Sequence, residues 1–219
     1  MNKLVKIGLV LGAIGLITIG TVFLIPWGNA ESEVEKSEVE ESAETIDMSE
    51  ITGTYVSQEN LDKVTSEIMF HITGPQDATG SFKKFTVELN AFEDYQKSSI
   101  NVVIDPMSVY TANKMRDESI KGEGFFESDN FPEIIFNSSQ IHIGDTSYTA
   151  TGKLFMLGVE KEITVNFMYE GKGKNKDGKP IIIFQGEFTL DRTEHGMKET
   201  PGIGNNVEVS FYTELVEKE

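Results

Sequence analysis

The feature that most constrains the fold of this chain is an apolar residue at every second position, repeated in one segment after another from residue 64 onward. Ile100, Val102 and Ile104 show this spacing in residues 98–105, and the same spacing recurs in residues 161–171 and 205–216. A period of two places these side chains on one face of an extended strand, whereas a helix needs a period near 3.6. The pattern therefore predicts half-buried β-strands.

Turn-forming residues separate the strands that this pattern predicts. Gly, Pro, Asp and Asn interrupt the alternation, and Asp177-Gly178 is a dipeptide typical of a tight hairpin. Several strands have about ten residues and would be about 33 Å long. Eight strands joined mostly by short turns form an antiparallel meander, and closing it into an elongated barrel removes the exposed edges. The predicted strands are residues 64–72, 82–91, 98–105, 133–143, 147–157, 161–171, 180–191 and 205–216.

One long connection, from Ile104 to Phe136, breaks the alternation between the third and fourth strands. Asp105-Pro106 ends the third strand, because proline cannot donate to a β-ladder. Residues 112–121 carry charges at helical spacing and predict a short helical excursion. Phe125 and Phe126 follow it as apolar anchors. A connection of this length in a compact domain is either functional or packed by its own aromatics, so the two phenylalanines are either a packed plug or a mobile gate.

A set of motif residues surrounds this break and continues in other segments. These residues are Ser99-Ile100, Ser108, Thr111, Asn113, Arg116-Asp117, Ile120-Lys121, Phe125-Phe126, Phe131-Pro132 and Phe136, together with Gly80-Ser81-Phe82, Gly152-Lys153-Leu154 and residues 192–197. In sequence order they resemble the YceI-like family of polyisoprenoid-binding, lipocalin-like barrels, over about residues 52–215; His195 stands where the family often has an aromatic residue. The resemblance implies an elongated eight-stranded antiparallel lipocalin-like barrel of the all-β class, with its short helical excursion between strands 3 and 4.

The candidate cavity lining is apolar without interruption, which suits a linear hydrocarbon better than a sugar or a nucleotide. The pattern alone favours side chains that fill the interior, and the family resemblance described above reverses this in favour of a hollow barrel. The candidate lining residues are Val87, Leu89, Val102, Ile104, Phe125, Phe126, Phe136, Leu154, Met156, Val165, Phe167, Phe184, Phe188, Val209 and Phe211.

A polar head group needs one or two donors, and Arg116, Arg192 and His195 are the candidates. Arg116 could instead pair with Asp117 or Glu118 and fix the excursion. No nucleophile-elbow, zinc-protease, P-loop or EF-hand spacing is present, and there is no cysteine. We therefore expect a binding protein and not an enzyme, with no metal and no cofactor other than a bound isoprenoid lipid.

The start of the chain predicts export. Ile7 to Ile25 is an uncharged run preceded by two lysines, long enough to span a bilayer, and Pro26-Trp27 suits a membrane interface. Gly28-Asn29-Ala30 would also suit signal-peptidase cleavage. Residues 1–28 are thus expected to be a transmembrane anchor or a signal peptide. The rest should lie outside the cytoplasm, membrane-anchored or secreted after cleavage.

An acidic segment follows, and residues 31–50 contain nine acidic residues against Lys36 alone. Such a segment repels itself, so we expect residues 29–50 to form a disordered linker and residues 51–219 the barrel domain. The net charge of −17 makes nucleic-acid binding improbable, because phosphate contacts need a basic face.

The expected function is binding an amphipathic isoprenoid-type lipid in the apolar barrel. The alternative is an envelope structural or interaction module whose barrel is filled. The expected partners are a long-chain isoprenoid or similar lipid and, through the N-terminal segment, a membrane.

Overall fold

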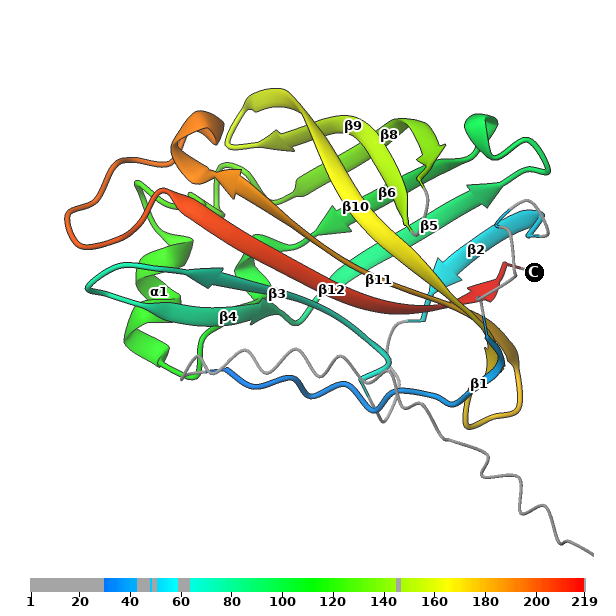
Figure 1. The fold of residues 1–219 in the computed structure, drawn as a ribbon. Coiled ribbons are helices and arrows are strands. Elements are labelled where there is room, and N and C mark those ends of the chain that lie inside the picture. The colour runs from blue at the N-terminus through cyan, green and yellow to red at the C-terminus, as the bar shows by residue number, and fades with distance from the viewer. Residues whose placement is uncertain (1–29, 43–47, 49–50, 59–63, 145–146, 219) are drawn as a thin grey trace, which may run out of the picture.

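A computed structural model describes residues 30–42, 48, 51–58, 64–144 and 147–218 (Figure 1). One α-helix and a single sheet make up most of this part. The strands are β1 (Val39–Ser42), β2 (Gly53–Ser57), β3 (Ser66–Ile72), β4 (Ala78–Phe82), β5 (Phe85–Ala91), β6 (Ser99–Ile104), β7 (Val109–Tyr110), β8 (Ile134–Ile143), β9 (Tyr148–Met156), β10 (Val159–Lys174), β11 (Pro180–Asp191) and β12 (Asn206–Glu217). The helix is α1 (Lys114–Lys121), and short 3-10 turns are η2 (Tyr95–Lys97), η3 (Pro106–Ser108) and η4 (Arg192–His195).

Eight of these strands close into a barrel. Antiparallel pairing runs in the order β10-β9-β8-β6-β5-β2-β12, and β11 completes the ring because it pairs with both β12 and β10. The predictions of an all-β class and an eight-stranded antiparallel barrel are confirmed. The ends of most predicted strands lie within three residues of the observed ends.

Two stretches of the sheet are built from broken strands. β12 pairs with β3 through Val207 to Thr213 and with β2 through Leu215 to Glu217, so β2 and β3 follow one another along the same neighbour. The predicted strand 82–91 is likewise interrupted at Lys83-Lys84, which lie between β4 and β5. β2 was not predicted, since its sequence GTYVS is short and has little alternation.

The excursion between β6 and β8 is held by side-chain caps at both of its turns. The Asp105 carboxylate accepts from the Met107 backbone N–H at 2.9 Å and caps η3, and the Asn113 side chain caps α1. Phe126 is 9% exposed and packs edge-on against Phe82, with ring centroids 5.5 Å apart. These contacts favour the packed plug over the mobile gate for Phe126.

Residues 30–42, which we call the strap, lie along the outside of the barrel (Figure 1). We expected a disordered linker over residues 29–50, but β1 within the strap pairs with β10 between Gly171 and Gly173. Acidic side chains of the strap meet lysines of the barrel: the pairs are Glu33–Lys83 at 2.8 Å, Glu40–Lys174 at 3.1 Å and Glu35–Lys176. These lysines offset the mutual repulsion of the acidic side chains, which favours packing of the strap against the barrel surface.

The predicted anchor or signal peptide, residues 1–28, lies outside the described residues. Within the described ranges, α1 has eight residues, and no helix there has the length and apolar character that crossing a bilayer requires.

Candidate functional site

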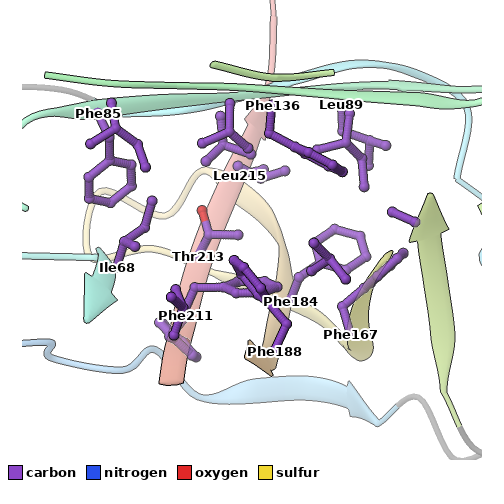
Figure 2. A pocket seen from close by; sticks show the side chains of 18 of the residues that line it. Ile68, Phe85, Leu89, Phe136, Phe167, Phe184, Phe188, Phe211, Thr213 and Leu215 are labelled. Carbon is purple, nitrogen blue, oxygen red and sulfur yellow. The ribbon is translucent and has the colours of Figure 1, made fainter. Parts of the chain in front are cut away.

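The barrel interior contains a narrow apolar cavity of about 130 Å³, which we call the inner compartment. Its wall is built from the inward-facing residues of the strands, as the alternation predicts. Figure 2 shows Phe85, Leu89 and Phe136 pointing into it from one wall, with Phe184 and Phe211 facing them from the other. Tyr148 stacks on Phe167 with ring centroids 5.4 Å apart, so part of this wall is fixed by aromatic contacts.

A second, wider cavity of about 490 Å³ lies beside α1, and we call it the outer compartment. Ile120, Phe125 and Phe126 line it from the excursion. Gln76 and Ser119 also line it and are exposed, so the outer compartment reaches the surface of the protein. Its volume falls within the range of about 300–1,000 Å³ typical of ligand pockets.

The two compartments share part of their walls. Ile68, Ile104, Leu154, Phe188 and Val209 line both, and we call this set the junction. An extended apolar chain could therefore pass from the outer compartment into the inner one along the barrel.

The structure places all fifteen predicted lining residues on these walls. Twelve line the inner compartment, and Phe125, Phe126 and Met156 line the outer one. Phe85 and Ile163 also line the inner compartment and follow the same alternation, so the pattern itself could have identified them. Met48 lines the inner compartment from within the expected linker, and no signal in its sequence surroundings pointed there.

Arg116 lines the outer compartment but forms neither ion pair that we considered. It donates from Nε to Thr111 Oγ1 and from Nη2 to the Thr111 carbonyl, both at 2.8 Å. Asp117 accepts from the Thr111 hydroxyl at 2.6 Å and from its backbone N–H at 2.8 Å. Both charged residues thus hold Thr111 and with it the start of α1, while Glu118 pairs with Lys121 at 3.1 Å.

Arg192 also lines the outer compartment, and it is 1% exposed. Its Nε donates to the Gly204 carbonyl at 2.8 Å and its Nη1 to the Lys198 carbonyl at 2.6 Å. Its Nη2 is buried without a hydrogen-bond partner among the described residues. Burial lowers the pKa of Arg192, and the charges of Asp191 and Glu199 oppose this shift.

The three histidines have different environments in the structure. His195 is 3% exposed, its Nδ1 has no partner among the described residues, and it lines neither compartment. Burial lowers the pKa of His195, and the Lys161 charge adds to this effect. His71 is buried with its Nε2 2.7 Å from Asp77 Oδ1, whereas His142 is exposed. Of the three head-group candidates, the two arginines therefore line the outer compartment and His195 lines neither of the two compartments.

Comparison with known proteins gives a consistent match. The model of the YceI-like domain matches residues 60–215. A UPF0312 protein of Staphylococcus epidermidis is 28% identical over 167 residues, which cover 71% of this chain and 95% of that protein. A UPF0312 protein of Pseudomonas savastanoi pv. phaseolicola is 28% identical over 124 residues, or 56% of this chain, and the match spans 65% of that relative's length.

Solved structures show the same fold. The BcnA protein of Burkholderia cenocepacia aligns with a TM-score of 0.61 at 22% identity, over 70% of this chain and 96% of that one. The YceI protein of Campylobacter jejuni aligns with a TM-score of 0.57 at 26% identity, over 64% and 85%. A polyisoprenoid-binding domain of Saccharophagus degradans aligns with a TM-score of 0.55 at 12% identity, over 77% and 100%.

Proposed function

This chain belongs to the YceI-like domain family, and from that premise we propose that its barrel binds an amphipathic isoprenoid-type lipid with the hydrocarbon along the barrel axis. The observation that carries the proposal is the junction, where five apolar residues belong to the walls of both compartments. A linear chain fits such a path better than a compact ligand does. A solved relative in fold is described as a polyisoprenoid-binding domain, which agrees with this ligand class.

Burial of the hydrocarbon supplies the binding energy in this proposal. Each buried CH₂ contributes about 0.8 kcal/mol, so ten carbons contribute about 8 kcal/mol before association costs. Micromolar affinity requires about 8.2 kcal/mol. Chain length therefore sets affinity, and the head group adds selectivity.

We propose binding without catalysis. No group of three or more His, Asp or Glu side chains that could hold a metal occurs among the described residues. Two polar groups of the outer compartment are engaged in the fold, since Arg116 holds Thr111 and Asp77 lies 2.7 Å from His71. We further propose that the domain acts outside the cytoplasm, with the first 28 residues as its anchor or its export signal.

A second candidate function follows from the size of the inner compartment. Its volume of about 130 Å³ is below the usual range for ligand pockets. An envelope structural or interaction module with a filled barrel would need no larger space.

The test is lipid retention by the purified full-length protein. The protein is incubated with a lipid extract of bacterial envelopes and repurified, and the lipids that remain are identified by mass spectrometry. One isoprenoid-chain lipid per chain is the expected result. Retention of straight-chain lipids only would overturn the isoprenoid class, and absence of any retained lipid would favour the filled-barrel module.

A further inference from the structure

The two arginines of this chain stand at the same cavity. The sequence contains 17 lysines but only Arg116 and Arg192 as arginines, and both line the outer compartment. No lysine of the described residues lines either compartment. The guanidinium group is planar, stays charged when buried and matches the geometry of phosphate and carboxylate, which an ammonium group does less well.

Arg192 makes no direct contact with a carboxylate among the described residues. Its two hydrogen bonds go to the backbone carbonyls of Gly204 and Lys198, and none goes to a carboxylate. Its Nη2 is buried and unpartnered among the described residues. Asp191 and Glu199 act on this charge without accepting a hydrogen bond from the guanidinium group. An anion bound at Nη2 would therefore stabilise the buried site further.

The remaining charges of the outer compartment leave room for an anion. Asp77 is the one carboxylate among the described residues of its lining, and its Oδ1 lies 2.7 Å from Nε2 of His71. Arg116 is half-buried, and its bonds to Thr111 use Nε and Nη2. In a chain with a net charge of −17, this cavity therefore has more positive than negative side chains in its wall.

We propose that the ligand carries an anionic oxygen head group, a phosphate or a carboxylate, which Arg192 binds in the outer compartment with Arg116 beside it. The tail then passes the junction and occupies the apolar inner compartment. This inference rests on the proposed lipid-binding function and adds the chemical class of the head and the direction of the chain. The ligand lies with its head beside α1 and its tail toward Leu89 and Leu215.

The test is a competition between two probes with the same tail. The full-length protein is incubated with equal amounts of geranylgeranyl phosphate and geranylgeraniol, repurified, and the retained probes are quantified by mass spectrometry. We expect the phosphate to be retained at least about tenfold more than the alcohol. Equal retention would overturn the head-group inference and leave lipid binding intact, whereas retention of neither would overturn the proposed function itself.

Variants test whether Arg192 causes the preference for the phosphate probe over the alcohol. Arg192→Gln should reduce the preference to about twofold or less, and Arg192→Lys should retain part of it. Lys153→Gln is the matched control, because it removes one positive charge from the exposed face of β9, where Lys153 pairs with Glu160 at 2.6 Å. An unchanged preference in Arg192→Gln would overturn the role of Arg192.

Two further measurements keep the inference testable if Arg192→Gln does not fold. Arg116→Gln should lower the preference severalfold, and the wild-type preference alone decides the head-group class. Equilibrium dialysis with radiolabelled inorganic phosphate distinguishes a free anion from a lipid head. Saturable retention of inorganic phosphate at micromolar concentration, with no preference between the two lipid probes, would overturn the inference and show that the site binds free phosphate.

Discussion

Ser37 donates both its backbone N–H and its hydroxyl to the carboxylate of Glu214, at 2.8 and 2.9 Å. Glu214 lies on β12 and is 2% exposed, and its Oε1 also accepts from the hydroxyl of Tyr212 at 2.9 Å. Burial, together with the Glu214 charge, raises the pKa of Tyr212. A residue of the acidic strap thus satisfies a buried carboxylate of the barrel, and Lys36 lies over the Tyr212 ring at 4.6 Å.

Ser37→Ala should destabilise the protein by about 1–2 kcal/mol, because a hydrogen bond to a charged group contributes about 1.5–3 kcal/mol and this one is only partly buried. Ser32→Ala is the matched control. Ser32 also donates to a carboxylate, that of Glu67 at 2.6 Å, but at an exposed position, so its loss should cost less than about 0.5 kcal/mol. Urea unfolding of both variants measures the difference. Equal effects would show that the strap does not cover Glu214 in solution.

Phe126→Ala should cost about 3–5 kcal/mol, because this ring is 9% exposed and packs on Phe82. Phe125→Ala should cost clearly less, since Phe125 is only half-buried beside the outer compartment. Thermal unfolding gives the stabilities, and the exchange rate of a fluorescent fatty acid reports on access to the cavity. A small loss of stability with faster exchange in Phe126→Ala would indicate a gate in place of a plug.

Val209→Phe should weaken binding of long-chain lipids while stability changes little, because Val209 belongs to the junction. If the larger ring excludes two CH₂ groups from the inner compartment, affinity falls about tenfold. Val103→Phe is the control, since Val103 is half-buried on β6 and lines neither compartment. Binding of lipids with graded chain lengths measures both variants. A loss of about 1–3 kcal/mol in Val209→Phe would instead mean that the interior is already filled.

His195→Phe should make the protein less sensitive to acid. The folded-state pKa of His195 lies below the ordinary value of 6.5, so below pH 6.5 the unfolded chain binds the proton more readily than the folded protein does. The stability that neutral His195 contributes to the folded protein is fully present above pH 6.5, and it is lost as the pH falls through the lowered pKa. Melting temperatures at pH 7.5 and 5.0 should therefore differ less in His195→Phe than in wild type. His142→Gln, at an exposed position, should keep the wild-type difference; an unaltered difference in His195→Phe would contradict the prediction.

Local patterns account for what could be predicted. Every barrel strand except β2 carries its own alternation, and the excursion carries its own end signals at Asp105-Pro106 and Asn113. The lining followed from the same alternation, because a strand in a closed barrel has one inward face. The family resemblance supplied the expectation of a hollow interior.

Contacts between distant parts of the chain account for most of what was missed. Ser37 and Glu214 are 177 residues apart, and Glu40 meets Lys174 across 134 residues, so nothing near the strap in sequence revealed its partners. Arg116 had two carboxylates beside it in sequence, yet the turn before α1 brought Thr111 closer to its guanidinium group. The division of the cavity into two compartments depends on how side chains from different strands meet at the junction, which periodicity does not encode.

The direction in which the strap runs gives the barrel an orientation relative to the start of the chain. Glu33 pairs with Lys83, whose Nζ lies 4.7 Å from the centre of the Tyr110 ring on β7, the strand that precedes α1, and the strap then runs away from the α1 side to β1 (Figure 1). The chain therefore joins the barrel surface on the side of the outer compartment. If the leader holds the protein in a membrane, as its sequence predicts, the barrel would turn its entrance toward that membrane. A lipid would then pass directly from the membrane into the outer compartment.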